Sequence, residues 1–283
     1  MTLTRREIVD LLAQHGLRPG RALGQNFVVD PNTVRRVARL AEVGPGDQVV
    51  EIGAGLGSLT LALLETGARV TAVEVDRGLV PVLRSVLKAR RGDQPTARVV
   101  EADARILDWS ALLGAGQWTL VANLPYNVAT PLIIDLLEGV PAIARMLVMT
   151  QREVGERLAA HPGQAAYGSV SVKVEYWATA AVIGHVPPTV FYPRPKVESA
   201  LVAIARRPTP AVPTTVVSYE RLSEVVRAGF AHRRKMLRRA LEGTVAAEAF
   251  DAAGVDPRAR AEELDVRAWG RLAAWTPSSP TPS

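Results

Sequence analysis

The stretch Gln48-Val49-Val50-Glu51-Ile52-Gly53-Ala54-Gly55-Leu56-Gly57 decides the fold of this chain. Its first half is a short apolar run typical of a buried strand, and its second half, residues 53–57, is a glycine turn with the spacing G-x-G-x-G. Residues 58–65 continue with apolar side chains at helical spacing. A strand, a glycine turn and a helix in this order let the backbone and a helix N-terminus approach a ligand closely. A dinucleotide-binding turn has the spacing G-x-G-x-x-G, so a pyrophosphate site is not the best match.

The segments that follow repeat the alternation of strand and helix. The predicted strands are residues 69–75, 97–102, 118–122 and 146–150, and the predicted helices are residues 79–89 and 131–137. Short apolar strands separated by helices are typical of an α/β fold with a doubly wound, Rossmann-like parallel sheet. Such sheets bind ligands at the carboxyl ends of their strands. Glu74, Asp103 and Asn123 all fall at such ends, as the glycine turn does.

Further elements are predicted before and after these strands. Asp30 and Pro31 have the form of a helix N-cap followed by proline at the first helical position. Residues 182–186 and 200–204 have strand patterns and are joined by the Pro-rich segment 187–195. The simplest interpretation is a hairpin that completes one end of the sheet.

The last part of the chain has a different character. Residues 206–215, with the sequence RRPTPAVPTT, are typical of a linker, and a helical pattern follows them. Within residues 225–241, basic side chains lie between the apolar positions, and no acidic residue interrupts them. The members of this basic cluster are Arg233, Arg234, Lys235, Arg238 and Arg239. A cluster of this kind fits contacts with RNA phosphates, although a solvated helix face has the same composition.

These patterns predict two domains and a tail. We expect a main domain over residues 1–205, a helical RNA-binding domain over residues 206–276 and a disordered tail over residues 277–283.

The composition is that of a globular protein with a basic surface. Hydrophobic residues make up 48% of the 283 residues, enough for a substantial core. The net charge of +6 favours a polyanionic partner, since surface Lys and Arg neutralise phosphates. The absence of Cys excludes disulfides and thiolate metal ligands, and the four His are scattered, so we expect no metal site. No apolar run is long enough to span a bilayer, and the N-terminus lacks a signal-peptide pattern, so we expect a cytoplasmic protein.

The residues Asn123-Leu124-Pro125-Tyr126 directly follow the predicted strand 118–122. Pro125 ends that strand because it has no N–H for the ladder. The Asn123 amide oxygen, the Leu124 carbonyl and the Tyr126 ring together suit a planar heterocycle with an exocyclic NH2. The ring can stack on its face while the two oxygens accept its amino hydrogens. On their own, these residues also fit a strand end with a capping Asn and a half-buried Tyr.

The features that precede this site predict a nucleoside cofactor. Glu74 can accept hydrogen bonds from both ribose hydroxyls. Asp103 can accept one from an adenine amino group. Each has an ordinary alternative when taken alone: a solvated carboxylate for Glu74, a helix cap for Asp103 and a tight connection for the glycine turn. In this order, and followed by Asn123, they favour S-adenosylmethionine and methyl transfer to a base nitrogen.

Ordered agreement over nearly the whole chain then identifies a family resemblance. The matching segments are GQNF at 24–27, EIGAGLGSLT at 51–60, VEVD at 73–76, EADA at 101–104, NLPYN at 123–127, QREVGERL at 151–158, AYGSVSV at 166–172, FYPRPKVESA at 191–200, FAHRRK at 230–235 and AGVDPRARAEEL at 253–264. In these segments the chain resembles the ribosomal RNA adenine N6-dimethyltransferases, specifically the type that acts on small-subunit rRNA. The resemblance implies a class I SAM-dependent methyltransferase sheet with a small C-terminal helical domain.

The resemblance also implies roles for individual residues. The residues expected to hold S-adenosylmethionine are Asn26 and Val28 at its methionine part, Gly53 and Gly55 against the cofactor, Glu74 at the ribose, Asp103 at the adenine amino group, and Asn123 between cofactor and target. The residues expected at the target adenine are Asn123, Leu124, Pro125, Tyr126 and Phe191, with Tyr126 and Phe191 stacking on opposite faces of the flipped base. Val28 stands where the family usually has Leu, and Ala54 where it often has Pro. Both keep an apolar side chain.

By the same resemblance, the partner is small-subunit rRNA, the targets are two adjacent adenosines near its 3′ end, and the enzyme is a monomer. Three alternatives stay open. A large-subunit rRNA dimethyltransferase of the antibiotic-resistance type shares the cofactor motifs, but the match over residues 151–200 favours the small-subunit type. A nicotinamide-dependent oxidoreductase would use the glycine turn and Glu74 but leaves residues 123–126 unexplained. A non-catalytic RNA-binding role would not require the whole site.

Overall fold

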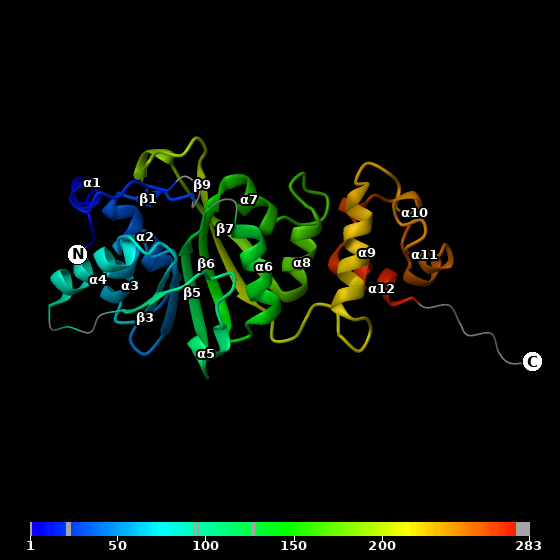
Figure 1. The fold of residues 1–283 in the computed structure, drawn as a ribbon. Coiled ribbons are helices and arrows are strands. Elements are labelled where there is room, and N and C mark those ends of the chain that lie inside the picture. The colour runs from blue at the N-terminus through cyan, green and yellow to red at the C-terminus, as the bar shows by residue number, and fades with distance from the viewer. Residues whose placement is uncertain (1, 21–23, 93, 95–96, 126–127, 276–283) are drawn as a thin grey trace, which may run out of the picture. The chain divides into compact units, whose positions relative to one another are not determined.

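The computed structural model describes residues 2–20, 24–92, 94, 97–125 and 128–275 (Figure 1). Its contacts divide the chain into two compact units. The first unit contains residues 1–156 and 180–206, and the second contains residues 157–179 and 207–283. One change of unit lies between residues 206 and 207. Residues 157–179, which we expected in the main domain, make their contacts within the second unit.

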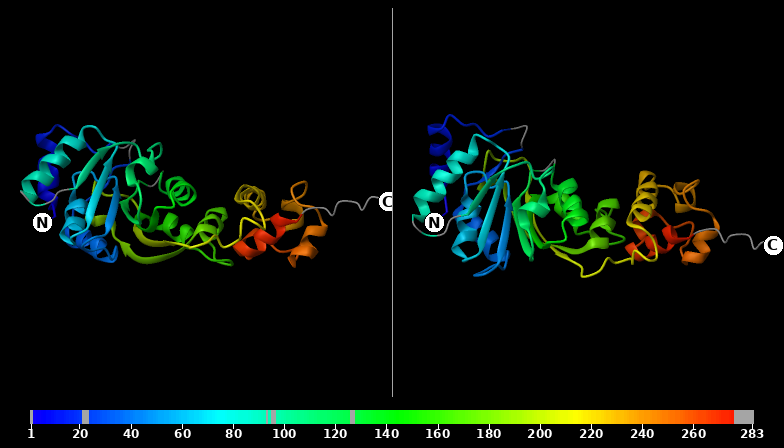
Figure 2. Two further views of the ribbon diagram at one scale, coloured as in Figure 1. Left: turned by 90° about the horizontal axis from the view of Figure 1, so that it is seen from below. Right: turned by 60° about the horizontal axis from the view of Figure 1, so that its bottom comes forward.

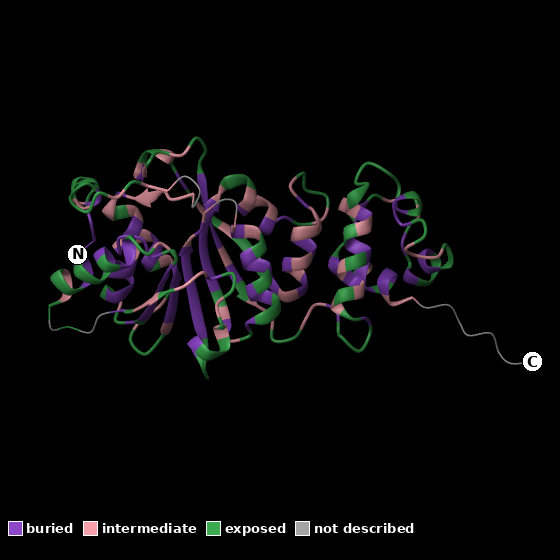
Figure 3. Ribbon diagram, viewed as in Figure 1, coloured by how far each residue is buried: buried purple, intermediate pink, exposed green. Residues whose placement is uncertain are grey.

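The first unit is built on a sheet whose described strands follow the order β4-β3-β2-β5-β6-β9-β7. Its strands are β2 (Gln48–Ile52), β3 (Arg69–Glu74), β4 (Arg98–Glu101), β5 (Trp118–Asn123), β6 (Ile143–Gln151), β7 (Ala178–Val186) and β9 (Ser199–Arg206). The strands from β2 to β6 are parallel, and β9 is antiparallel to β6. The central strands are buried along most of their length (Figure 3), which explains their apolar runs. The predicted α/β fold is confirmed.

Helices cover this sheet as a doubly wound fold requires. They are α1 (Arg5–Gln14), α2 (Pro31–Leu40), α3 (Ser58–Glu65), α4 (Leu79–Arg91), α5 (Trp109–Leu113), α6 (Ala129–Gly139) and α7 (Arg152–Leu158). Buried side chains of α1 to α4 share one hydrophobic core with the sheet. Right-handed crossovers place α6 on the opposite face, and Figure 2 shows helices on both sides of the strands. The predicted N-cap of α2 is present, since the Asp30 carboxylate accepts from the Thr33 N–H at 2.8 Å.

The strand order reverses between β2 and β5, and this reversal positions the candidate site. From β2 the chain first adds β3 and β4 on one side, and then adds β5 and β6 on the other. Connections on the two sides diverge at such a switch point and leave a crevice beyond the carboxyl ends of the strands. The glycine turn follows β2 in this crevice, and Leu124 follows β5.

A small two-stranded sheet closes over this part of the unit. It joins β1 (Phe27–Val28) to β8 (Phe191–Tyr192), with Val28 opposite Phe191. The Arg5 guanidinium of α1 also contacts this connection, since it donates to the Thr189 carbonyl at 2.9 Å. β8 and the short 3-10 helix η1 (Pro188–Val190) lie in the connection between β7 and β9. The predicted hairpin is therefore present, and its long connection also pairs with the N-terminal segment.

The second unit is a cluster of short helices around aromatic side chains. It contains α8 (Ser169–Trp177), α9 (Tyr219–Ala231), α10 (Leu237–Ala240), α11 (Glu248–Ala253), α12 (Val266–Ala274) and the 3-10 helix η2 (Ala261–Glu263). Trp269 is fully buried and packs against Phe230, with ring centroids 5.8 Å apart. The Tyr167 hydroxyl donates to the Leu264 carbonyl at 2.9 Å. This bond and the packing of α8 on α9 explain why residues 157–179 belong to this unit.

The sequence has a helical pattern over residues 225–241, but these residues do not form one continuous helix. α9 ends at Ala231, and the chain turns through residues 232–236 before α10 begins. The Leu237 N–H donates to the Ala259 carbonyl at 2.8 Å, so tertiary contacts replace helical hydrogen bonds at this point. A continuous helix would also have stacked like charges at i and i+4, for example Arg234 with Arg238.

Gly57 is a position where the fold depends on glycine, and its replacement is testable. Its φ is +89°, and an added Cβ would lie 2.7 Å from Leu83 Cδ1. Gly57→Ala should therefore lower the free energy of unfolding by about 2–4 kcal/mol, through left-handed strain and overpacking. Urea denaturation measures this loss. Gly139→Ala is the matched control, because Gly139 has no positive φ and open space around its Cβ position. Equal losses in the two variants would contradict the argument.

Candidate cofactor and substrate site

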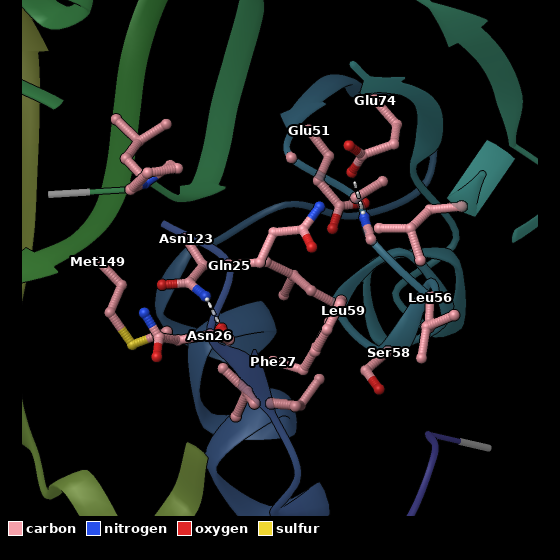
Figure 4. Close-up of a pocket in the computed structure, with 18 of the residues that line it drawn as sticks. Gln25, Asn26, Phe27, Glu51, Leu56, Ser58, Leu59, Glu74, Asn123 and Met149 are labelled. Atoms are coloured by element: carbon pink, nitrogen blue, oxygen red, sulfur yellow. Dashed lines mark hydrogen bonds between the residues drawn. The ribbon is translucent and has the colours of Figure 1, made fainter. Parts of the chain in front are cut away.

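A pocket opens at the carboxyl ends of β2, β3 and β5 (Figure 4). Its polar lining comes from several elements that are distant in sequence: Gln25, Asn26, Glu51, Ser58, Glu74 and Asn123. Its apolar lining includes Phe27, Val28, Leu56, Leu59, Val75, Leu79, Leu124 and Met149. The structure thus brings Asn26, Val28, the glycine turn, Glu74 and Asn123 together around one cavity, as the sequence analysis expected.

Glu74 ends β3 and faces the glycine turn. One carboxylate oxygen accepts from the Gly55 N–H at 2.7 Å. The other accepts from the N–H groups of Val75 and Asp76, both at 2.9 Å. Burial raises the pKa of the Glu74 carboxyl, and these three N–H donors oppose that shift. A carboxylate held by three backbone donors is fixed in position and can still present lone pairs to a ligand.

Glu51 is a second buried acid in the pocket, and we assigned it no role from the sequence. It lies one residue before the end of β2 and is 1% exposed. The Thr60 hydroxyl of α3 donates to its carboxylate at 2.5 Å. Burial raises the pKa of the Glu51 carboxyl to about 8, with Glu74 adding to the shift. The available signal was a charged residue inside an otherwise apolar strand.

The pocket is electrostatically one-sided. Its described lining contains two carboxylates, and no Lys, Arg or His side chain is among these residues. Buried charges are normally paired, so two acids without a cation indicate a site shaped for a positively charged ligand. The Ser58 hydroxyl also lines the pocket and, within the described part of the chain, is buried without a hydrogen-bond partner. It remains available to a ligand.

Asn123 is oriented by the N-terminal segment. Its amide nitrogen donates to the Asn26 carbonyl at 2.9 Å, as Figure 4 shows. A carbonyl partner requires the NH2 end of the amide, so the amide oxygen is left to face another group. At the next residue, the Leu124 N–H donates to the Met149 carbonyl at 2.9 Å. The end of β5 is therefore fixed from both neighbouring segments.

The remaining residues of the Asn123–Tyr126 segment are only partly described. Leu124 is buried, and Pro125 lines the pocket beside it. Tyr126, which we expected to stack on the target base, lies outside the described residues.

Gln25 is a second residue whose part in the site the sequence analysis missed. Its amide nitrogen donates to the Asp76 carboxylate at 2.8 Å, and its amide oxygen accepts from the Gly20 N–H at 2.7 Å. These bonds attach the N-terminal segment to the loop after β3. The segment GQNF was recognised only as a motif, and no rule of spacing links Gln25 with a residue 51 positions later.

Two expected site residues lie away from the pocket lining. The Asp103 carboxylate is held by Arg105, whose Nη2 lies 2.6 Å from it. Hydrogen bonds from the Arg105 side chain hold the pKa of the Asp103 carboxyl below its usual range. Phe191, in β8, is 1% exposed and belongs to the hydrophobic core of the first unit. Neither residue is among those that line the pocket.

The basic cluster lies in the second unit, on the turn after α9 and on α10, and its five side chains are exposed. Arg233 pairs with Glu262 at 2.7 Å, and Arg239 lies 3.8 Å from Glu242. Arg234 and Lys235 have no carboxylate within 4.0 Å among the described residues. Carboxylates of the same unit thus balance the charges of Arg233 and Arg239, whereas the charges of Arg234 and Lys235 can interact with a polyanion.

Residues 18–277 match the ribosomal RNA adenine dimethylase family. The chain belongs to this family. It is 48% identical to ribosomal RNA small subunit methyltransferase A of Kineococcus radiotolerans, over 97% of this chain and 92% of the relative. It is 49% identical to the protein of that name from Cutibacterium acnes, over 89% of this chain and 87% of the relative. The resemblance drawn from the motifs is confirmed.

The crystal structures of two other proteins have folds similar to that of this chain. The 23S rRNA methyltransferase ErmE is 26% identical, with a TM-score of 0.66 over 87% of this chain and 98% of that one. A dimethyladenosine transferase from Plasmodium falciparum is 20% identical, with a TM-score of 0.72 over 86% and 94%. The second likeness concerns the fold alone. None of the described helices is long and apolar enough to cross a membrane, and the described residues contain no cluster of His, Cys, Asp or Glu suited to a metal.

The raised pKa of Glu51 predicts a pH-dependent stability. Between an unfolded value of 4.5 and a folded value of about 8, the folded protein holds one proton more than the unfolded chain. The free energy of unfolding should therefore fall as pH rises through this range, by up to about 1.4 kcal/mol per pH unit. Glu51→Gln has no such titration and should be more stable than the natural protein at the upper end.

Calorimetric melting of the ligand-free protein across this range tests the prediction. Glu101→Gln on β4 is the matched control, because the Glu101 side chain is 43% exposed and pairs with an exposed Arg77. It should leave the slope unchanged. A slope that Glu51→Gln also leaves unchanged would contradict the prediction.

Proposed function

We propose that this protein dimethylates N6 of two adjacent adenosines near the 3′ end of small-subunit rRNA, with S-adenosylmethionine as methyl donor, during assembly of the small subunit. The observation that carries the proposal is the pocket with two acids at the carboxyl ends of β2, β3 and β5, with Asn123, whose amide nitrogen donates to Asn26, in its lining. The names of the relatives and the family membership support the same reaction.

The pocket suits S-adenosylmethionine better than a nicotinamide dinucleotide. The sulfonium and ammonium groups outweigh the single carboxylate of this cofactor, so it carries net positive charge into a lining with two acids and no cation. A pyrophosphate would meet the same acids without a basic residue to balance them. We therefore propose that Glu74 holds the ribose, and that Asn26, Val28 and the glycine turn hold the methionine part. When bound, the cofactor supplies an activated methyl group.

The role of Asn123 follows from its orientation. Adenine N6 is a weak nucleophile because its lone pair is delocalised into the ring. Hydrogen bonds from N6–H to the Asn123 amide oxygen and the Leu124 carbonyl would favour a pyramidal nitrogen with its lone pair directed at the donor. Because Asn26 holds the other end of the amide, the acceptor is oriented before the base arrives. The N6 proton can leave after transfer, so no general base is required.

Two proposed contacts require local rearrangement. For Phe191 to stack on the target base opposite Tyr126, its ring must leave the core position in which it is 1% exposed. For Asp103 to accept from the cofactor's amino group, Arg105 must yield part of the carboxylate that it now holds through Nε and Nη2. Both residues remain proposals that rest on the family resemblance.

The basic cluster is proposed to bind rRNA phosphates. Arg234 and Lys235 on the turn after α9, and Arg238 on α10, supply exposed positive charge, and contacts with the RNA phosphates can position RNA without reading its sequence. We also infer that the protein acts as a monomer in the cytoplasm, where small subunits are assembled.

Methyl transfer from labelled S-adenosylmethionine to purified ribosomal subunits tests the function. Small subunits from a strain without this dimethylation should accept about four methyl groups each, recovered as N6,N6-dimethyladenosine, and large subunits should accept none. Asn123→Ala should lower kcat by a factor of about 100 or more while cofactor affinity changes far less, since its amide acts mainly at the reacting nitrogen. An unchanged kcat would remove this role. Label on large subunits would instead favour the reaction named for ErmE.

Charge reversal tests the RNA-binding role of the basic cluster. The double variant Arg234→Glu, Arg238→Glu should weaken binding to small-subunit rRNA and reduce the slope of log affinity against log salt by about 2, one for each lost phosphate contact. Filter binding at several salt concentrations measures both. Arg35→Glu, Arg39→Glu on the exposed face of α2 makes the same change in net charge and should leave the slope almost unchanged. Equal effects in both double variants would place the phosphate contacts elsewhere.

A further inference from the structure

The two buried acids of the pocket differ in how their charge is supported. Glu74 accepts three backbone N–H groups, spread over both carboxylate oxygens. Glu51 accepts one hydroxyl hydrogen, from Thr60 at 2.5 Å, and is the more buried of the two at 1% against 4%. Hydrogen-bond donors stabilise the ionised form of a carboxyl, and burial without donors stabilises the neutral form. In the free protein the proton therefore belongs on Glu51 and the negative charge on Glu74.

The described residues around Glu51 provide no cation that would change this assignment. Glu74, from β3, is the charged group that faces Glu51 among the described residues, and it repels a second negative charge. α3 presents the neutral Thr60, β5 presents the neutral Asn123, and the N-terminal segment presents Gln25 and Asn26. Two ionised acids in this cavity would be an uncompensated buried pair.

We propose that Glu51 is protonated in the free protein and releases its proton to solvent when the cationic cofactor enters the pocket, so that cofactor capture is coupled to proton release. The inference rests on the proposed function, because it takes S-adenosylmethionine as the ligand. Glu51 then acts as a positioning residue: its charge appears only when a positive ligand is present to balance it. An opposite charge within several ångströms favours the ionised carboxylate, and the effect is large where water is excluded.

Binding calorimetry tests the coupling without any measurement of turnover. Titration with S-adenosylmethionine in two buffers of different ionisation enthalpy gives the number of protons released. The Glu51 contribution should be close to one proton released per site at about pH 7 and about a tenth at about pH 9, because the free carboxyl has a pKa of about 8. Through this contribution, Kd should fall about tenfold for each unit by which the pH rises toward this pKa.

Glu51→Gln is the decisive variant, since it keeps the shape and the hydrogen-bond acceptor but has no proton to lose. It should release about one proton fewer near pH 7 and show a flatter dependence of Kd on pH. The cofactor's own amino group, with an ordinary pKa of about 7.7–8.0, titrates equally in both proteins and cancels in the comparison. Equal release by the two proteins, with both binding the cofactor, would overturn the inference and leave the proposed function intact. Failure of the natural protein to bind the cofactor at any pH would overturn the proposed function and this inference with it.

A second pair of measurements keeps the test valid if Glu51→Gln does not fold. Infrared difference spectra of the natural protein should show the loss of a protonated-carboxyl band when the cofactor binds; no such loss would overturn the inference. Thr60→Val removes the donor that stabilises the ionised form, so proton release should extend to higher pH in this variant. An unchanged pH range in Thr60→Val would show that the released proton comes from another group.

Discussion

Burial of two carboxylates at the ends of adjacent parallel strands is the constraint on which the site depends. β2 and β3 pair in parallel, so Glu51 and Glu74 reach the same edge of the sheet. The glycine turn must then bend back over this edge, because the Gly55 N–H is one of the donors that holds Glu74. Gly57 starts α3 with a left-handed φ, and α3 in turn supplies Thr60 to Glu51. The turn, the helix and both acids therefore form one arrangement. Backbone N–H groups hold the Glu74 carboxylate, whereas Glu51 accepts from the Thr60 hydroxyl.

The N-terminal segment completes this arrangement from outside the sheet. It contacts the loop after β3 through Gln25 and Asp76, and the end of β5 through Asn26 and Asn123. β1 then pairs with β8, so the long connection between β7 and β9 also bounds this part of the unit. Residues 24–28 line the pocket together with residues at the ends of β2, β3 and β5, so segments distant in sequence form one site. Asn123 gains a defined orientation only because the Asn26 carbonyl, 97 residues earlier, occupies its NH2 end.

Sequence patterns predicted the sheet well because each parallel strand is an apolar run between turn residues, and β2 and α3 were predicted to the residue. Glu74 and Asn123 were predicted because both stand at strand ends, where ligand sites of such folds lie. Patterns failed where tertiary contacts override local spacing. The helical pattern over residues 225–241 includes a segment that forms a turn in the structure. There the Leu237 N–H donates to the Ala259 carbonyl instead of to a carbonyl of the same helix. Arg105 beside Asp103, the core position of Phe191 and the contacts of residues 157–179 depend on packing that spacing does not encode.

Opposite charges serve the two proposed binding tasks of this chain. The described lining of the cofactor pocket contains no basic side chain, and its two acids are buried at the edge of the sheet. The basic cluster, in the other unit, lies on an exposed turn where solvent reduces the mutual repulsion of its members. A net charge of +6 attracts polyanionic RNA over distances longer than a contact, while the pocket selects a small cation at close range. A pocket without basic side chains has a physical reason. A Lys or Arg in it would neutralise Glu74 and remove the preference for a positively charged methyl donor.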